Sequence, residues 1–404
     1  MAATGKLYLV LMGLPATGKS VLARKLQETL AGDGRNVRIF NNGDVRRRLF
    51  PRNTSFAEFY NPDNAQYSAL RDEIALINIY EAKNWLMEGG EIAILDATNV
   101  SRARRAKIES HLHEHPILYI ETVNNDPELY AYSIDRKTRL PEFAHLSYEE
   151  ARQSFEERIN FYRKLYCPLN DERNHLVLDT LNNRVLKEHI QDHIPHYFQI
   201  RDLLVADWVK GLYLVRHGET TWNAEQRIGG DPLLNDRGHA QARAMAERLK
   251  GLPLGFVFTS SRQRTHQMAE PLLCARPEAR HMVIKEFDEI HAGICEGMTY
   301  EEMRRTLPQE FSARSADKYQ YTYPGGESYV TLLSRVGRGL KKALWIAGIS
   351  QNICIVGHQA VNRAILAQFL FRRLQDVPYI NIPQEKYYHI ISLQERKVVE
   401  LVQY

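Results

Sequence analysis

The sequence has few cysteines and no long apolar run, and both shortages narrow the kind of protein that it encodes. The four cysteines, Cys167, Cys274, Cys295 and Cys354, are widely separated and form no Cys-x-x-Cys pair. Neither a zinc site nor a disulfide framework is therefore predicted. No stretch approaches the roughly 20 apolar residues that a membrane-spanning helix needs, and the first residues lack the layout of a signal peptide. We expect a cytoplasmic protein with no membrane partner.

Glycine, proline and charge of one sign are also scarce. The chain has 23 Gly and 16 Pro in 404 residues, too few for a collagen-like or low-complexity protein. Its 53 Lys and Arg against 49 Asp and Glu leave a net charge of +4, which is too small for a dedicated nucleic-acid-binding protein. The composition is that of an ordinary globular protein, and the length suits two or three domains of about 150 residues each.

Short β-rich runs alternate with longer amphipathic stretches in both halves of the chain. This alternation is typical of βαβ units, in which helices cover both faces of a parallel sheet. A helix is expected around Arg184–Phe198, between the two halves. The fold class predicted is therefore α/β with two unlike domains in tandem, residues 1–208 and 209–404. The expected strands are Leu7–Met12, Ile92–Leu95, Ile117–Ile120 and Leu176–Leu178, then Leu212–Val215, Phe256–Thr259, Ile353–Val356 and Val398–Val402.

The first strand runs into a phosphate-binding loop. The segment Gly13-Leu14-Pro15-Ala16-Thr17-Gly18-Lys19-Ser20 has the pattern G-x-x-x-x-G-K-[ST] and precedes a helix expected over Val21–Leu30. Such a loop turns its backbone N–H groups toward phosphate, and Lys19 adds a positive charge. Ser20 would place its hydroxyl on Mg²⁺. A chance glycine-rich turn is the alternative, but the strand and helix on either side favour a nucleotide site.

Asp96 stands at the end of the second expected strand, in Asp96-Ala97-Thr98-Asn99. An acid beside a phosphate loop can hold Mg²⁺ or take the proton from an attacking hydroxyl. The alternative is a carboxylate that caps the helix beginning near Arg102. Arginines that recur near strand ends and helix starts add planar bidentate donors, which indicate a small phosphorylated acceptor. They include Arg46, Arg71, Arg104, Arg136 and Arg158, with Lys137 and Tyr162 close by in the sequence.

The second half begins with a histidine at a strand end. Leu212–Val215 leads into Arg216-His217-Gly218, where a backbone carbonyl can hold one ring nitrogen and leave the other to attack phosphorus. A capping or core histidine is the alternative. Arg264 and His358 follow two later strands, so both are expected at the same sheet edge. Glu289 could protonate the leaving alkoxide. Together these residues predict phosphate hydrolysis through a phosphohistidine, with no metal or other cofactor.

The two centres, in this order, resemble the bifunctional 6-phosphofructo-2-kinase/fructose-2,6-bisphosphatase family. The resemblance runs from about Leu7 to near the C-terminus, and the second half by itself resembles the histidine phosphatase superfamily. Segments more specific to the bifunctional family are FNNGDVRRRL at 40–49, DATN at 96–99, RIGGDP at 227–232, EIHAGICEGMTYEE at 289–302, DKYQYTYPGGESY at 317–329 and GHQAVNR at 357–363.

The resemblance implies control of glycolysis and gluconeogenesis through synthesis and hydrolysis of fructose 2,6-bisphosphate by a cytoplasmic homodimer. ATP with Mg²⁺ would bind at residues 13–20 and Asp96. Fructose 6-phosphate would be held by Arg46, Arg71, Thr98, Arg104, Arg158 and Tyr162. In the second domain His217 would be the nucleophile and Glu289 the proton donor, and the 2-phosphoryl group would contact Arg216, Arg264, His358, Asn223 and Gly229. The rest of the bisphosphate would contact Tyr300, Arg314, Lys318, Tyr329, Gln359 and Arg363.

Three departures from the family pattern lie in the first half. Thr17 stands where the family typically has arginine, Asn124 where it often has cysteine, and Thr138 where it has lysine. They support one rival hypothesis, a sensor whose nucleotide-binding half regulates a working phosphatase. A second rival is a kinase of nucleic-acid 5′-ends joined to a general phosphatase. The expected strands begin just after Met1 and end near the last residue, so we also expect a form without the long phosphorylatable extensions of animal relatives.

Overall fold

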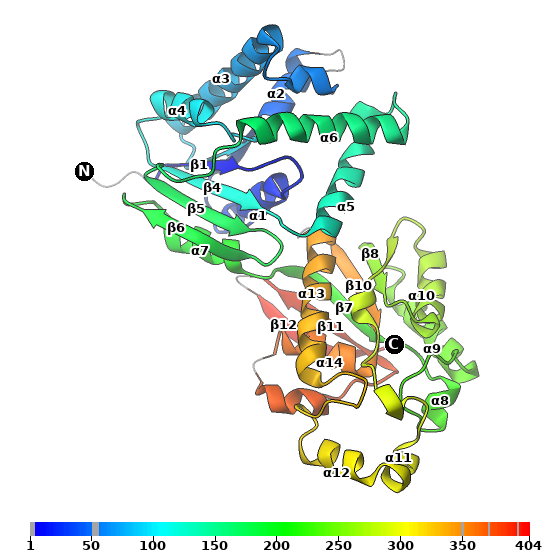
Figure 1. Ribbon diagram of the computed structural model, residues 1–404. Coiled ribbons are helices and arrows are strands. Elements are labelled where there is room, and N and C mark those ends of the chain that lie inside the picture. Colours follow the sequence, from blue (N-terminus) through cyan, green and yellow to red (C-terminus); the bar gives the residue numbers. More distant parts are fainter. Residues whose placement is uncertain (1–4, 51–55, 349–350, 371, 394–395) are drawn as a thin grey trace. The chain divides into compact units, whose positions relative to one another are not determined.

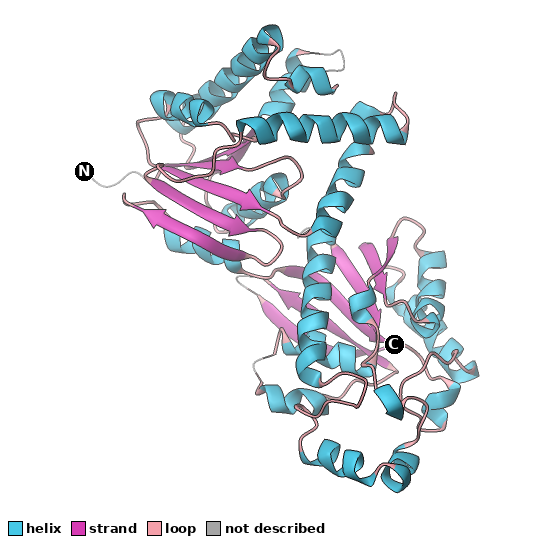
Figure 2. Cartoon of the chain, viewed as in Figure 1, coloured by secondary structure: helices cyan, strands magenta, loops and turns pink. Residues whose placement is uncertain are grey.

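The computed structural model describes residues 5–50, 56–348, 351–370, 372–393 and 396–404. The chain divides into two compact units, Met1–Ala206 and Asp207–Tyr404 (Figure 1). Each unit has a six-stranded, mostly parallel sheet with helices packed on it (Figure 2). The predicted α/β class with two unlike tandem domains is confirmed.

The sheet of the first unit has the strand order β2-β3-β1-β4-β5-β6, in which only β6 is antiparallel to its neighbour. Its strands are β1 (Leu7–Met12), β2 (Val37–Asn41), β3 (Ile92–Asp96), β4 (Ile117–Val123), β5 (Asn174–Asp179) and β6 (Arg184–Ile190). Its helices are α1 (Lys19–Gly32), α2 (Asn42–Leu49), α3 (Ala65–Met87), α4 (Arg102–His111), α5 (Pro127–Thr138), α6 (Tyr148–Leu165) and α7 (Tyr197–Val205), with short 3₁₀ turns η1 (Ala57–Tyr60) and η2 (Pro141–Phe143).

Strand β1 is buried along its whole length because helices cover both of its faces. Tyr8, Val10 and Met12 point to one face and form a core with Ile79 of α3 and Ile108 of α4. The alternate residues of the strand are equally buried and point the other way. A strand buried on both sides reads as a continuous apolar run, which is why the sequence predicted it so well.

The helix expected around Arg184–Phe198 is wrong over most of that span. Residues 184–190 form β6, an exposed edge strand that pairs antiparallel with β5, and the helix α7 begins only at Tyr197. The strand carries Arg184, Lys187 and Glu188. Charged side chains on an edge strand discourage pairing with other chains, and they also hide the alternation by which a strand is recognised.

The sheet of the second unit has the order β12-β11-β7-β10-β8-β9, with β11 and β12 antiparallel to their neighbours. Its strands are β7 (Val209–Arg216), β8 (Leu254–Thr259), β9 (Arg280–Val283), β10 (Asn352–Gly357), β11 (Lys386–Ser392) and β12 (Lys397–Gln403). Its helices are α8 (Thr221–Ala224), α9 (Asp236–Leu249), α10 (Gln263–Ala275), α11 (Tyr300–Thr306), α12 (Pro308–Ala316), α13 (Tyr329–Ala347) and α14 (Gln359–Ala367), with 3₁₀ turns η3 (Lys285–Phe287), η4 (Gly293–Cys295) and η5 (Leu374–Tyr379).

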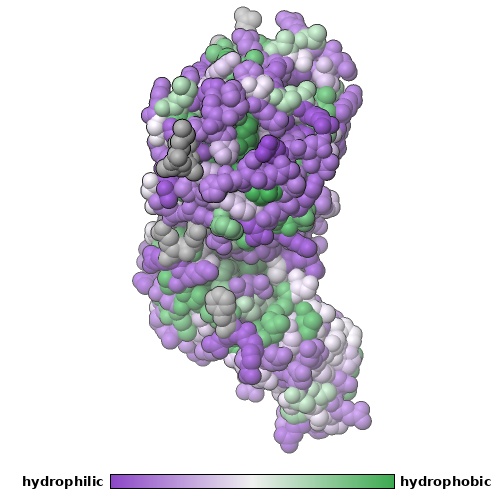
Figure 3. All heavy atoms as spheres, turned by 90° about the vertical axis from the view of Figure 1, so that its left-hand side faces the viewer, coloured by the Kyte–Doolittle hydropathy of each residue, from purple (hydrophilic) through white to green (hydrophobic). Residues whose placement is uncertain are grey.

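Three parallel strands at the centre of this sheet end side by side. β10 pairs with β7 on one side and with β8 on the other, and Gly357 lies opposite Arg216 in the register. The segments that follow the three strands therefore start from one sheet edge. Among the described residues, no helix is both long enough and apolar enough to cross a bilayer. The face of the molecule in Figure 3 is covered mainly by hydrophilic residues.

Candidate active sites

The loop between β1 and α1 is shaped by two glycines with positive φ angles. Gly13 has a φ of 144°, and a Cβ atom there would lie 2.6 Å from the backbone oxygen of Thr122. Gly18 has a φ of 94° and caps α1, which begins at Lys19. A side chain at either position would strain the backbone. The loop and the helix N-terminus thus have the form that a phosphate-binding cradle requires.

The Lys19 ammonium group lies inside the curve of this loop. Its Nζ donates hydrogen bonds to the carbonyl oxygens of Gly13 at 2.8 Å and Leu14 at 2.6 Å. Burial lowers the pKa of Lys19 to about 7, although the nearby Asp96 carboxylate works in the opposite direction. A bound polyphosphate would place negative charge beside this buried lysine and so favour its protonated form.

Thr17 forms hydrogen bonds that hold the loop in place. Its hydroxyl donates to the Leu14 carbonyl at 2.8 Å and lies 2.7 Å from the hydroxyl of Thr122 on β4. Thr122 in turn donates to the Met12 carbonyl at 3.1 Å. This chain of hydroxyls ties the loop to the sheet, so Thr17 has a structural task.

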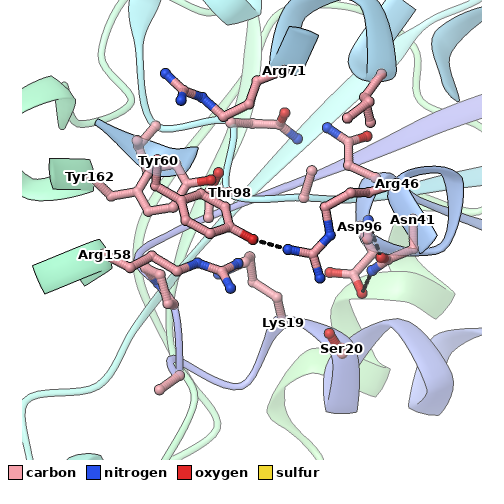
Figure 4. Close-up of a pocket in the computed structure, with 18 of the residues that line it drawn as sticks. Lys19, Ser20, Asn41, Arg46, Tyr60, Arg71, Asp96, Thr98, Arg158 and Tyr162 are labelled. Carbon is pink, nitrogen blue, oxygen red and sulfur yellow. Dashed lines mark hydrogen bonds between the residues drawn. The ribbon is translucent and has the colours of Figure 1, made fainter. Parts of the chain in front are cut away.

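The loop opens on a cavity of about 900 Å³ in the first unit. Lys19, Ser20 and Asp96 line it, as do all six residues expected to hold the phosphorylated acceptor. All of these except Arg104 are labelled in Figure 4. Those six residues are Arg46, Arg71, Thr98, Arg104, Arg158 and Tyr162. The structure thus brings the two predicted parts of this site to one cavity.

Asp96 ends β3 and faces this cavity instead of capping a helix. Asn41, at the end of the neighbouring β2, donates from Nδ2 to Asp96 Oδ2 at 2.8 Å (Figure 4). The helix that follows, α4, is capped by Ser101, whose hydroxyl accepts from the Arg104 backbone N–H at 3.2 Å. The interpretation of Asp96 as a helix cap is therefore wrong.

Arg46 and Arg158 extend toward each other across the cavity above the loop (Figure 4). The Arg158 guanidinium carbon lies 3.9 Å from the centre of the Tyr60 ring, and Arg46 donates to the Tyr60 hydroxyl and to Glu142 at 2.7 Å. Tyr60 was not expected from the sequence. It holds two guanidinium groups in place, which prepares them to meet an anion.

Arg71 and Arg104 use part of their donor sets within the protein. Arg71 donates to the backbone oxygens of Phe59 and, at 3.3 Å, of Asn61. Arg104 forms an ion pair with Asp72. Each guanidinium carries five N–H donors, so both still have donors for a ligand.

Lys137 is a cavity residue whose placement the sequence did not indicate. The face of α5 toward the cavity presents Ser133, Arg136 and Lys137, at the three- and four-residue spacing of one helix face. Thr138 lies off this face, is buried, and donates to the Asp135 carbonyl at 2.9 Å. Lys137 makes no hydrogen bond to the described residues, and burial lowers its pKa, as do the nearby Arg136 and Arg158.

Asn124, the third departure from the family pattern, lies just after β4. Its Oδ1 accepts from the Asp126 backbone N–H at 3.0 Å. Its Nδ2 is buried without a partner among the described residues. Asn124 does not line the cavity described above.

In the second unit, His217 follows β7 directly and is buried. Its Nδ1 lies 2.8 Å from the Gly218 carbonyl oxygen. A carbonyl can only accept, so Nδ1 carries the proton and Nε2 keeps its lone pair. Burial and the neighbouring Arg264 and Arg216 guanidinium groups hold the pKa of His217 well below its usual range. The ring is thus a neutral imidazole with a free nucleophilic nitrogen.

Four further predicted residues gather around His217. The His358 ring centre lies 5.2 Å from that of His217, and Arg264 Nε donates to His358 Nδ1 at 3.2 Å. Glu289 accepts from the Ala360 backbone N–H at 3.2 Å. Arg216 donates to the Ile382 carbonyl at 3.0 Å, and burial lowers its pKa to about 10 against the pull of Glu289. The predicted convergence at one sheet edge is what the structure shows.

Asn223 and Gly229 also adjoin this edge. The Asn223 Oδ1 accepts from the Thr220 backbone N–H at 3.2 Å and from Gln384 Nε2 at 3.0 Å, which leaves its NH₂ group to donate to a ligand. Gly229 has a φ of 71°, and a Cβ atom there would meet Glu296 at 1.8 Å. Gln359 is the first residue of α14, next to His358.

A second group of cations lies near Arg216. Arg314 donates to the hydroxyls of Tyr323 at 2.7 Å and Tyr300 at 3.2 Å, and Arg363 donates to the Tyr329 hydroxyl at 3.1 Å. Lys318 Nζ donates to the Pro378 carbonyl at 3.1 Å. Burial and the neighbouring Arg363 and Arg314 lower the pKa of Lys318 to about 8. These cations can balance the charge of a second phosphate.

Comparisons with known proteins match both units. Residues 1–201 match the 6-phosphofructo-2-kinase family and residues 212–403 match branch 1 of the histidine phosphatase superfamily. The chain is 34% identical over 384 residues to 6-phosphofructo-2-kinase/fructose-2,6-bisphosphatase 1 of Rattus norvegicus, covering 93% of this chain and 79% of that protein. It is 36% identical over 391 residues to 6-phosphofructo-2-kinase/fructose-2,6-bisphosphatase 3 of Bos taurus, covering 93% and 81%. The crystal structure of the alpha-ribazole phosphatase from Shigella flexneri, 24% identical, matches with a TM-score of 0.43 over 48% of this chain and 96% of that chain.

Proposed function

The chain belongs to the bifunctional 6-phosphofructo-2-kinase/fructose-2,6-bisphosphatase family, and on that premise we propose that it both makes and hydrolyses fructose 2,6-bisphosphate. The first unit transfers the γ-phosphoryl group of ATP to the 2-hydroxyl of fructose 6-phosphate. The second unit removes that group again as inorganic phosphate. The observation that carries the proposal is that each unit has its own cationic site at the ends of its parallel strands.

For synthesis, the loop N–H groups and Lys19 bind the ATP phosphates, and the far part of the cavity holds the sugar phosphate. Ser20 and Asp96 line the same cavity. A hydroxyl and a carboxylate are the hard oxygen donors that suit Mg²⁺, which would neutralise phosphate charge when bound with ATP. Asn41 occupies Asp96 Oδ2, so Oδ1 stays available to the metal or to the sugar hydroxyl.

Lys137 joins Lys19 in this proposal as a second ammonium group at the transfer site. It lines the cavity, the charges of Asp96 and Arg158 act on it, and its own charge acts on Lys19. A cation that has no hydrogen-bonding partner in the described residues is suited to the charge on a transferring phosphoryl group. Lys137 thus provides a lysine one residue before Thr138, the position at which the family typically has lysine.

For hydrolysis, His217 Nε2 attacks the phosphorus of the 2-phosphate, and the bond to the sugar oxygen breaks. Glu289 gives its proton to that oxygen, so fructose 6-phosphate leaves as an alcohol and the phosphoryl group stays on His217. Glu289, now a carboxylate, takes a proton from water as the water attacks the phosphohistidine. Arg216, Arg264 and His358 surround the phosphoryl oxygens, and the cations near Lys318 hold the 6-phosphate.

The four cysteines are unpaired, and we propose the reducing cytoplasm as the place where the protein acts. Homodimerisation stays a prediction from the family. The boundary between a kinase domain of residues 1–208 and a phosphatase domain of residues 209–404 also belongs to this proposal.

The experiment that tests the proposal incubates the purified chain with fructose 6-phosphate, Mg²⁺ and ATP labelled at the γ-phosphate. Labelled fructose 2,6-bisphosphate should form and then decay, with acid-labile label on His217. Lys19→Ala should abolish synthesis and spare hydrolysis, and His217→Ala should do the reverse. ATP binding without any labelled bisphosphate, beside full hydrolysis, would establish the sensor instead. Equal loss of both activities in either variant, with the fold intact by circular dichroism, would overturn the proposal of independent sites.

A further inference from the structure

Ser260 lies directly after β8 and is completely buried, yet neither the sequence nor the mechanism above assigns it a task. Its hydroxyl oxygen is 2.8 Å from His358 Nε2. His358 is itself completely buried beside the His217 ring. The inference that follows rests on the proposed hydrolysis at His217.

The protonation of His358 follows from its two ring contacts. Arg264 Nε is a donor and points at His358 Nδ1 at 3.2 Å, so Nδ1 must present a lone pair. A neutral imidazole carries one N–H group, and here that group is at Nε2. The Nε2–H therefore donates to the Ser260 oxygen, which acts as the acceptor.

The remaining bonds of the Ser260 hydroxyl are also accounted for. Its oxygen accepts a hydrogen bond from the Arg262 backbone N–H at 3.1 Å, and its O–H donates to the Thr265 hydroxyl at 3.0 Å. The Thr265 hydroxyl in turn donates a hydrogen bond to the Arg262 carbonyl at 2.8 Å. Both hydroxyl side chains are buried, so the Ser260 hydroxyl has one orientation, with an acceptor aimed at His358.

We propose that Ser260 is a positioning residue of the phosphoryl site, which holds His358 in its Nε2–H tautomer with Nδ1 turned toward Arg264 and the phosphoryl pocket. Because Ser260 accepts from Nε2 whether the ring is neutral or charged, any proton that His358 gains when a phosphoryl group binds enters at Nδ1. There, once Arg264 Nε has turned from Nδ1 to the phosphoryl group, it becomes a donor to a phosphoryl oxygen. Without Ser260, Nε2–H is left buried and unpaired, and the other tautomer becomes competitive.

The surrounding charges explain why the tautomer matters. Arg264, His217, Arg262 and Arg216 face the ring, and together with burial they hold the pKa of His358 well below its usual range. The Glu289 carboxyl group accepts from the Ala360 backbone N–H, two residues along the chain from His358. The ring is consequently neutral in the free site, and only an incoming phosphoryl dianion favours its charged form. The nitrogen that then takes the proton decides whether His358 can donate a hydrogen bond to the bound phosphoryl group.

The kinetic test compares Ser260→Ala with Ser261→Ala. Ser261 is the next residue, is exposed, and donates to Asp288 at 2.6 Å, which makes it a matched control. Ser260→Ala should lower the kcat for fructose 2,6-bisphosphate hydrolysis by about 10- to 100-fold, the size of the effect when a partner that orients a metal-bound imidazole is lost. Its KM should change little, because the cations near Lys318 are untouched. Ser260→Cys, which keeps a weak acceptor, should recover part of the loss, and Ser261→Ala should keep the wild-type kcat.

The spectroscopic test reads the tautomer directly from ¹⁵N-histidine-labelled protein, with the His358 signals assigned by their loss in His358→Asn. Wild type and Ser261→Ala should show a protonated Nε2 and a bare Nδ1, and Ser260→Ala should show a shift toward the Nδ1–H form. An unchanged tautomer in Ser260→Ala, or equal loss of kcat in the two alanine variants, would overturn the proposal. Should the wild type fail to hydrolyse the bisphosphate, the proposed function fails, and the tautomer measurement still decides the part played by Ser260.

Discussion

Asn41 Nδ2 donates a hydrogen bond to Asp96 Oδ2 at 2.8 Å, and the two residues lie opposite each other in the register of β2 and β3. The same Asn41 side chain caps α2, because its Oδ1 accepts from the Gly43 backbone N–H at 2.7 Å and from that of Asp44 at 3.3 Å. One amide group therefore starts a helix with its oxygen and orients the acid of the kinase site with its nitrogen.

These two tasks of Asn41 can be separated by substitution. Asn41→Asp keeps an acceptor for the helix cap but faces Asp96 with a second carboxylate, which replaces the hydrogen bond with like-charge repulsion. We expect synthesis of the bisphosphate to fall about tenfold or more while α2 keeps its cap, and the repulsion between the two carboxylates should also lower the free energy of unfolding. Asn41→Ala removes the cap and should cost about 1 kcal/mol of unfolding free energy. Urea unfolding and initial rates measure both effects, and wild-type synthesis in the aspartate variant would contradict the role of Asn41 in orienting Asp96.

ATP binding should be accompanied by proton uptake at Lys19. With a pKa of about 7 in the free site, Lys19 is mostly neutral at pH 8, and the phosphates favour its charged form. Uptake should therefore be large near pH 8 and shrink toward pH 6, where the lysine is already charged. Calorimetry in buffers of different ionisation enthalpy counts the protons. Lys19→Arg, which stays charged, should bind ATP without this uptake, and equal uptake in that variant would assign the proton to another group.

Lys137 should contribute to synthesis although the family lysine position is Thr138. Lys137→Met removes the ammonium group from the cavity and should lower the kcat of synthesis about 100- to 1,000-fold, the range for losing one electrostatic contact to the reacting group. Arg139→Met is the matched control, because Arg139 is exposed at the same helix end, forms an ion pair with Asp135 at 3.1 Å and lies over the Tyr148 ring, 5.8 Å from its centre, outside the cavity. Steady-state rates of both reactions should show hydrolysis unchanged in the two variants. Equal synthesis rates in them would refute a role for Lys137.

Hydrolysis should lose substrate affinity above pH 8 because of Lys318. Its pKa of about 8 in the free site means that it is charged below this pH and becomes neutral above it. The substrate phosphates lose their second proton near pH 6, so they do not change between pH 7 and 9. The KM for fructose 2,6-bisphosphate should therefore rise from pH 7 to pH 9. In Lys318→Arg, where the charge persists, the KM should stay nearly level over that range, and a rise as steep as in the wild type would point to another group.

The strand at residues 184–190, where a helix was expected, and the position of Lys137 in the cavity were missed for a common reason. Both features depend on which residues pack against the segment in the folded chain, and neither local spacing nor composition predicts those tertiary neighbours. Residues 184–190 become a strand because the edge of β5 is available to pair with them. Lys137 faces the cavity and Thr138 does not, because successive residues on a helix point about 100° apart and the packing of α5 selects which face turns inward.

The sequence by itself determined the two α/β units, the phosphate loop and the positions of Asp96, His217, Arg264 and His358 at or soon after strand ends. Those features follow from local backbone geometry and from the rule that parallel strands carry functional residues at their carboxyl ends. Only the tertiary structure decided that Asn41 orients Asp96, that Tyr60 holds two arginines and that Ser260 sets the proton of His358. A hydrogen bond between residues far apart in the chain requires distances and directions, and those exist only once the strands are aligned and the helices are packed.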